Sequence, residues 1–241
     1  MNVKKHYDNH LGNFYSWMVG DFNLNQKKQQ DFYEKNNLIP QSSKIAFDLG
    51  CGHGLHSISL ENLGFHVKAI DFNAQLLDEL KNRSEKRNIE IFNDDIRNIK
   101  NYNNYLPEVI ICCGDTLTHL ETLDEVNLFI QDSCFLLDKN GIFVLSFRDY
   151  SYELKDINRF IHVKSDENNI LTCFLEYDKE KVTVTDIFYT KKEDVWEQKI
   201  SSYNKIRIKA NDIIDILSKC NMKIVLNESL NGLITIISNK N

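Results

Sequence analysis

The chain has 241 residues, of which 42% are hydrophobic and 27% charged, a composition that excludes disordered and collagen-like classes and suits one globular domain with an appendage. Its 29 basic and 35 acidic residues give a net charge of −6, the wrong sign for binding the phosphates of a nucleic acid. A small-molecule partner is therefore favoured.

The N-terminal residues are polar and aromatic and do not form the apolar segment of a secretory signal. No run approaches the roughly 18 apolar residues that a membrane span needs. We therefore expect a cytoplasmic protein with no membrane partner. The six cysteines show no paired metal-ligand spacing, which predicts reduced thiols in the core and no metal site.

At the start of the chain, Tyr7, Leu11, Tyr15 and Met18 recur at helical intervals, and a polar helix is expected over about residues 24–37. We assign residues 1–40 to an N-terminal helical flap. Its aromatic side chains are typical either of a packing face or of a lid over a ligand.

Between residues 44 and 145, short apolar runs alternate with segments of helical spacing. The apolar runs cover residues 45–47, 66–70, 89–92, 109–113 and 141–145. Repeated strand–helix–strand units predict an α/β fold, with a parallel sheet covered by helices on both faces. One helix should begin at Thr122, where Thr122 and Glu125 form a capping-box pattern.

After Tyr150 the pattern changes to β-type segments separated by turn residues. Turns at 166–169 and 178–181 predict hairpins, so residues 160–208 are assigned to an antiparallel insertion. A helix near 210–221 and strands at 223–226 and 233–237 should complete the main sheet. The core domain is thus predicted over residues 41–159 and 209–241.

The strongest local motif is a glycine-rich loop that follows the first apolar run and precedes a helix. Gly50 and Gly52 allow a ligand to approach the backbone where a Cβ would collide, and the helix that follows offers unpaired N–H groups. Leu55 stands where a dinucleotide-binding loop would carry its third glycine, which argues against an NAD-dependent oxidoreductase.

Two acidic positions follow the next two predicted strands. Asp71 ends the second strand, where a carboxylate can accept both hydroxyls of a ribose. Asp95 follows the third strand and can accept from an adenine amino group, while Ile96 supplies an N–H group and apolar contact to the ring.

With these residues in this order, the sequence resembles the class I S-adenosylmethionine-dependent methyltransferases. The resemblance implies a Rossmann-like, mostly parallel sheet of seven strands, with S-adenosylmethionine bound at the C-terminal ends of the first strands and S-adenosylhomocysteine as the product. The residues expected to bind the cofactor are Tyr15, Asp48, Gly50, Cys51, Gly52, Asp71, Phe72, Asp95, Ile96, Cys112 and Cys113.

The segments 111–120 and 146–150 resemble more narrowly the small-molecule enzymes of the glycine N-methyltransferase type. That resemblance implies that Asp115 contacts the acceptor amine, that Arg148 pairs with its carboxylate, and that the insertion covers the substrate side. A carboxylate at 115, where that family has an amide, favours a cationic amine. The family's arginine for the cofactor carboxylate aligns with Asn25, and Lys27 or Lys28 is the candidate replacement.

The predicted reaction is direct in-line methyl transfer to a small molecule, N-directed before O-directed. A neutral amine needs no dedicated base, whereas an alcohol or phenol would need one, and His119 is the candidate. A divalent metal between Asp115 and Asp149 is disfavoured because Arg148 would repel it. A non-catalytic protein that binds S-adenosylmethionine remains the alternative from another class.

Overall fold

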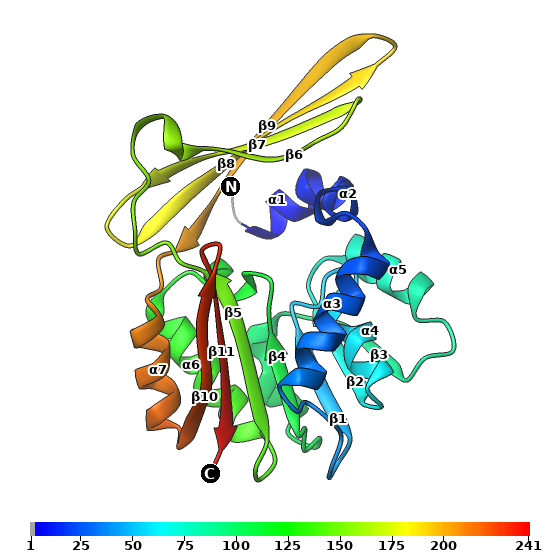
Figure 1. Cartoon of the computed structure of the whole chain (residues 1–241), viewed down its shortest axis with the longest axis vertical. Coiled ribbons are helices and arrows are strands. Elements are labelled where there is room, and N and C mark those ends of the chain that lie inside the picture. Colours follow the sequence, from blue (N-terminus) through cyan, green and yellow to red (C-terminus); the bar gives the residue numbers. More distant parts are fainter. Residues whose placement is uncertain (1–2) are drawn as a thin grey trace.

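The computed structural model describes residues 3–241 and contains two sheets, with the N-terminal helices between them (Figure 1). The larger sheet contains β1 (Ile45–Leu49), β2 (His66–Asp71), β3 (Ile89–Asn93), β4 (Val109–Cys112), β5 (Ile142–Arg148), β10 (Met222–Leu230) and β11 (Leu233–Lys240). Their order is β10-β11-β5-β4-β1-β2-β3, and only β11 runs antiparallel to the other six strands. This is the predicted seven-stranded, mostly parallel sheet.

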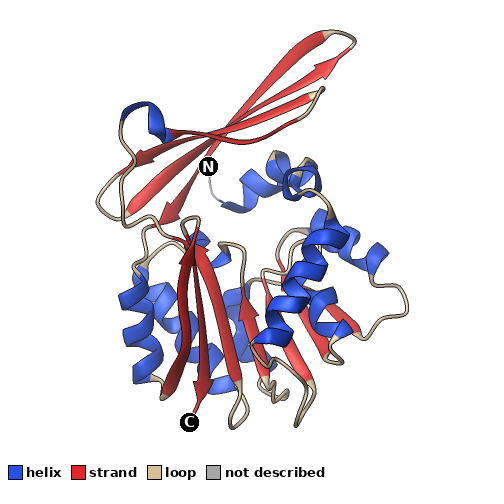
Figure 2. Ribbon diagram, in the orientation of Figure 1, coloured by secondary structure: helices blue, strands red, loops and turns tan. Residues whose placement is uncertain are grey.

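Helices cover both faces of this sheet (Figure 2). One face carries α3 (Phe22–Lys35), α4 (Leu55–Asn62) and α5 (Ala74–Arg83), and the other carries the 3-10 segment η2 (Ile96–Tyr102), α6 (Leu123–Leu136) and α7 (Ala210–Lys219). All four residues of the central strand β4 are buried, as expected for a strand covered on both sides. The predicted Rossmann-like fold is confirmed.

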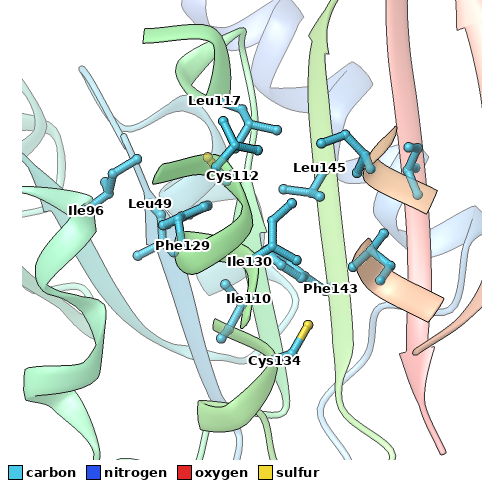
Figure 3. Packing of buried hydrophobic residues seen from close by; sticks show 14 of the residues in the cluster. Leu49, Ile96, Ile110, Cys112, Leu117, Phe129, Ile130, Cys134, Phe143 and Leu145 are labelled. Atoms are coloured by element: carbon cyan, nitrogen blue, oxygen red, sulfur yellow. The ribbon is translucent and has the colours of Figure 1, made fainter. Parts of the chain in front are cut away.

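On the sheet face covered by α6, the apolar residues that recur at helical intervals in the sequence pack against the strands. Phe129 and Ile130 of α6 lie against Ile110 and Phe143 of the sheet, and all four side chains are at most 2% exposed (Figure 3). Burying such side chains stabilises the fold by roughly 1.5–3 kcal/mol each.

The beginning of α6 also follows the prediction in part. Thr122 is the N-cap, and its side chain accepts a hydrogen bond of 3.1 Å from the backbone N–H of Glu125. The reciprocal bond of a capping box is replaced, because the Glu125 carboxylate accepts from the N–H of Glu121 instead.

The N-terminal segment is less regular than its helical spacing suggests. It comprises α1 (Val3–Asn9), the 3-10 turn η1 (Leu11–Asn13) and α2 (Tyr15–Val19). Gly12 is a poor helix former, and the Asn13 side chain donates to the carbonyl of His10, so local polar groups compete with a continuous helix.

The four-stranded sheet is formed by β6 (Phe160–Ser165), β7 (Asn169–Tyr177), β8 (Lys181–Lys192) and β9 (Val195–Ile206), and is antiparallel throughout. The 3-10 turn η4 (Asp156–Arg159) leads into it. The carboxylates of Asp166 and Asp178 accept backbone N–H groups in the first two hairpin turns, which confirms both predicted turns.

All six cysteines are free thiols, as predicted. No helix within residues 3–241 is long and apolar enough to cross a membrane. Over the same range, no three His, Cys, Asp or Glu side chains come together in an arrangement that would hold a metal ion.

Candidate cofactor and acceptor site

A cavity of about 1080 Å³ lies at the C-terminal ends of the parallel strands. Ligand pockets usually measure about 300–1,000 Å³, so this cavity has room for two small molecules side by side. Residues that follow β1, β2, β3 and β4 form one part of its wall, and residues of β5, β8, β9 and the β10–β11 hairpin form another. The N-terminal segment contributes Tyr7 and Tyr15.

The glycine-rich loop forms the part of the wall next to β1. Gly50, Gly52 and Gly54 all have positive φ angles, of 76°, 52° and 91°, which the loop needs in order to turn into α4. Gly50 and Gly52 line the cavity, whereas Gly54 packs against Leu80 of α5. The three glycines thus serve different purposes: Gly52 leaves backbone open to a ligand, whereas the missing Cβ of Gly50 makes room for Thr116 and that of Gly54 makes room for Leu80.

This division predicts that Gly54→Ala destabilises the protein through packing. Its Cβ would overlap Leu80, which costs about 1–3 kcal/mol for overpacking, in addition to the strain of a left-handed backbone. Gly232→Ala is the matched control, because Gly232 has φ 74° and no neighbouring atom within 4 Å of an added Cβ. Urea denaturation should show the larger loss for Gly54→Ala; equal losses would contradict the packing role.

Asp71 stands at the end of β2 and lines the cavity with only 9% of its surface exposed. Its Oδ2 accepts the N–H of Gly52 at 2.9 Å, and its Oδ1 accepts the N–H of Asn73 at 2.8 Å. Burial raises the pKa of this carboxyl, and the backbone hydrogen bonds oppose that rise. Each oxygen keeps a further lone pair that can accept a hydroxyl group.

The carboxylate of Asp95 is already engaged in this structure. Both of its oxygens accept from the Arg97 guanidinium, at 3.0 and 2.6 Å. Partial burial raises the pKa of Asp95, but the hydrogen bonds from Arg97 outweigh it and hold the pKa below its usual value. Asp95 and Ile96 both line the cavity, so an adenine amino group would have to share Asp95 with Arg97.

Three of the predicted site residues are placed behind the wall instead of on it. Asp48 is 1% exposed and accepts a hydrogen bond of 2.5 Å from Ser57, and Cys112 is fully buried in the core. Asp115 has a φ of 78°, which turns its carboxylate inward, and it forms an ion pair with Lys205. The cavity lining includes none of these three side chains.

The remaining predicted residues line the cavity: Tyr15, Cys51, Phe72, Cys113, His119 and Arg148. Burial raises the pKa of the Cys51 and Cys113 thiols, the latter to about 12, so neither is a thiolate at neutral pH. Burial likewise raises the pKa of Tyr15 to about 12, which leaves its hydroxyl neutral.

His119 lies at the end of the 3-10 turn η3 (Thr116–His119), and its Nε2 is 3.3 Å from the hydroxyl of Tyr7. Burial and, secondarily, the charge of Lys205 lower the pKa of His119 to about 3, so the imidazole is neutral at physiological pH. Its Nδ1 is buried and has no hydrogen-bond partner in the described part of the chain.

Arg148 ends β5 as an exposed side chain, and its guanidinium donates to the carbonyl of Asn231 at 3.0 Å. It does not neutralise Asp115, whose cation is Lys205. Of the two lysines considered as partners for a cofactor carboxylate, Lys28 lines the cavity, whereas Lys27 forms an exposed ion pair with Asp31.

Sequence reasoning missed two residues here. Thr116 packs against the bare backbone of Gly50, and Lys205 enters the cavity from β9. The alternation of side chains along β9 could have identified Lys205. Every second residue from Ser201 onward, Ser201, Tyr203 and Lys205, is buried on the same face of the strand. A buried lysine is unusual.

Residues 46–141 match the family model described as a methyltransferase domain. This match supports the class I S-adenosylmethionine-dependent methyltransferase family that the sequence resembles. A methyltransferase domain is also consistent with the predicted enzymatic nature of the protein.

Two curated relatives and one solved structure are similar to this chain. YqeM of Bacillus subtilis (strain 168), provisionally named a methyltransferase, is 23% identical over 190 residues, which cover 77% of this chain and 76% of YqeM. Glycine/sarcosine N-methyltransferase of Aphanothece halophytica is 25% identical over 138 residues, or 56% of this chain and 52% of that protein. An S-adenosylmethionine-dependent methyltransferase from Clostridium acetobutylicum ATCC 824 superposes with a TM-score of 0.75 at 19% identity, covering 89% and 92% of the two chains.

Proposed function

We propose that this methyltransferase transfers a methyl group from S-adenosylmethionine to the amine nitrogen of a small-molecule acceptor. The observation that carries the proposal is the single cavity that joins the Gly50–Gly52 loop and Asp71 to a second wall containing His119 and Arg148. A bound sulfonium cofactor would supply an electrophilic methyl group. The residues of the chain would bind the cofactor and the acceptor, orient them toward each other and exclude water.

The residues on the first wall fit this cofactor. Gly52 and Gly114 present backbone to the cavity, and an added Cβ at Gly114 would meet no atom within 4 Å. Asp71 would hold the ribose hydroxyls, and Ile96 would contact the adenine ring. Phe72, Tyr15 and Tyr7 would cover the cofactor from the side of the N-terminal segment.

The acceptor would lie on the second wall. Asn204 and Lys205 of β9 and Lys181 of β8 line the cavity there, which supports the proposal that residues 160–208 form a cap over the substrate side. Such a cap excludes water from a reactive sulfonium.

A nitrogen atom of the acceptor is favoured over an oxygen atom as the site of methylation, because the side chains on this wall are poor proton acceptors. With a pKa of about 3, His119 is a weak proton acceptor, and the Cys113 thiol is protonated. A neutral amine already carries its lone pair and needs no such base, whereas an alcohol does. The similarity to a glycine/sarcosine N-methyltransferase points the same way.

The direct test is methyl transfer from labelled S-adenosylmethionine to a panel of small amines, alcohols and phenols. We expect label on amines and S-adenosylhomocysteine as the co-product. Label on alcohols or phenols alone would overturn the nitrogen assignment. Tight binding of S-adenosylmethionine with no transfer to any acceptor would favour the non-catalytic alternative.

Arg148 is proposed to orient an acidic group of the acceptor near the mouth of the cavity. A guanidinium grips a carboxylate with two parallel hydrogen bonds, which a lysine cannot reproduce. Arg148→Lys should therefore lower kcat/KM for an acidic acceptor by roughly tenfold to a hundredfold, from the value of one hydrogen bond between charged groups. S-adenosylhomocysteine affinity and Tm should stay near wild type, because Arg148 is exposed. A lower Tm with normal turnover would instead identify a structural arginine.

A further inference from the structure

Lys205 is a buried cation whose side chain reaches the cavity from the antiparallel sheet. It is 8% exposed, and its Nζ pairs with the carboxylate of Asp115. The rings of Tyr203 and Tyr150 lie 5.5 and 5.8 Å from Nζ. This arrangement resembles a recognition site for an ammonium group, and an ammonium of the protein itself occupies it.

The carboxylate of Asp115 has no capacity left for a ligand. Its Oδ1 accepts the backbone N–H of Arg148 at 2.8 Å and lies 2.9 Å from the hydroxyl of Thr118, which it shares with the backbone carbonyl of Asp115. Its Oδ2 accepts from Lys205 and from the hydroxyl of Tyr150 at 3.3 Å. Four donors on two oxygens account for the lone pairs of a carboxylate, so Asp115 is not free to bind an acceptor amine.

Lys205, in contrast, has a donor to spare. An ammonium has three N–H groups, and among residues 3–241 only the Asp115 carboxylate and the Tyr150 hydroxyl accept from it, which leaves one N–H group for a ligand. Burial lowers the pKa of Lys205, but Asp115 and the surrounding tyrosines outweigh burial and raise it, so the cation persists at neutral pH. Because Lys205 lines the cavity, a ligand on the acceptor wall would lie close to its charge.

We propose that Lys205 selects the acceptor of this methyltransferase by binding an anionic oxygen of it and by repelling acceptors that are cationic. This rests on the proposed function and replaces the expected contact between Asp115 and a cationic amine. The implied substrate class is an amine that also carries an acidic group.

His119 gives a readout for an anion bound at Lys205. The charge of Lys205 contributes to the low pKa of His119, so an anion bound at Lys205 should raise that pKa. Nuclear magnetic resonance titration of His119 with and without a bound carboxylate measures this change, which a merely structural lysine would not produce.

The closing experiment compares matched probes by calorimetry, both without cofactor and with saturating S-adenosylhomocysteine. The probes are benzoate, benzamide, benzylamine and phenylphosphonate. We expect wild-type protein to bind benzoate at least tenfold more tightly than benzamide or benzylamine, and phenylphosphonate shows whether the site prefers a carboxylate. Equal affinity for benzoate and benzamide, or no binding of any probe, would overturn the proposal.

Variants separate recognition from folding. Lys205→Met should abolish the preference for benzoate, while Lys199→Met, an exposed lysine of the same strand, should keep it. Because Lys205→Met leaves Asp115 unpaired, the double variant Lys205→Met/Asp115→Asn removes both charges and should recover Tm without recovering the preference. A double variant that regains the preference would show that Lys205 acts only as the partner of Asp115. Affinity for S-adenosylhomocysteine tests the proposed function separately.

Discussion

Asp71→Ala is expected to weaken binding of S-adenosylhomocysteine at least tenfold. The substitution removes the acceptor of two proposed ribose hydrogen bonds, each worth about 1.5–3 kcal/mol when the acceptor is charged. A loss of about 1.4 kcal/mol is already tenfold in the dissociation constant, so one lost bond suffices. Titration calorimetry measures the affinity directly.

The control must separate loss of ligand binding from loss of stability, because Asp71 also accepts hydrogen bonds within the protein. Its carboxylate also accepts the N–H groups of Gly52 and Asn73, so Asp71→Ala should loosen the glycine-rich loop and lower Tm. Asp71→Asn retains one carbonyl-type acceptor and the shape of the side chain, and should lose less Tm than Asp71→Ala while still binding more weakly than wild type. Unchanged affinity in Asp71→Ala would remove the ribose assignment.

The features that sequence predicted well are those encoded by local patterns. The glycine-rich loop, the strand that ends at Asp71 and the hairpin turns at Asp166 and Asp178 each depend on a few adjacent residues, whose backbone requirements are specific. Alternating strands and helices then leave few ways to arrange a parallel sheet.

The features that sequence could not predict depend on contacts between distant residues. Asp115 and Lys205 are 90 positions apart, and only the docking of the antiparallel sheet brings them together. Asp115 also has a left-handed backbone, with a φ of 78°, which is uncommon for a residue other than glycine. The helical spacing of Tyr7 and Tyr15 predicts that they lie on one side, and both line the cavity, but periodicity alone does not reveal the break in the helix at Gly12 between them.

Asp48→Asn is expected to stabilise the protein at pH 8 and to have little effect near pH 4. Asp48 is 1% exposed, and burial raises its pKa to about 7, with the nearby charge of Asp71 adding to the rise. A carboxyl whose pKa is higher in the folded state than in the unfolded state holds a proton that the unfolded chain has lost. Stability therefore falls as pH rises from about 4, the unfolded pKa, to about 7.

The size of this effect follows from the shift. About three pKa units at about 1.4 kcal/mol each give an upper limit of about 4 kcal/mol above pH 7. An asparagine at 48 stays neutral and can still accept the hydrogen bond from Ser57, so the variant should avoid most of this loss. Asp178→Asn is the control of opposite sign, because hydrogen bonds from the backbone of Lys181 and Glu180 lower the pKa of Asp178. Its stabilising contribution is present above the unfolded pKa and is lost as pH falls.

Urea denaturation at pH 4 and pH 8 decides between the outcomes. At pH 8 we expect the free energy of unfolding to be higher for Asp48→Asn than for wild type and lower for Asp178→Asn. A lower free energy of unfolding for Asp48→Asn at pH 8 would contradict the destabilising effect of the buried charge.

The affinity of Asp48→Asn for S-adenosylhomocysteine then tests why a destabilising carboxylate lies beside the glycine-rich loop. Because Asp48 does not line the cavity, it can act on a ligand only through its field or by positioning that loop. Weaker binding by a more stable protein would show that the charge serves the cofactor, and unchanged binding would show that Asp48 only packs.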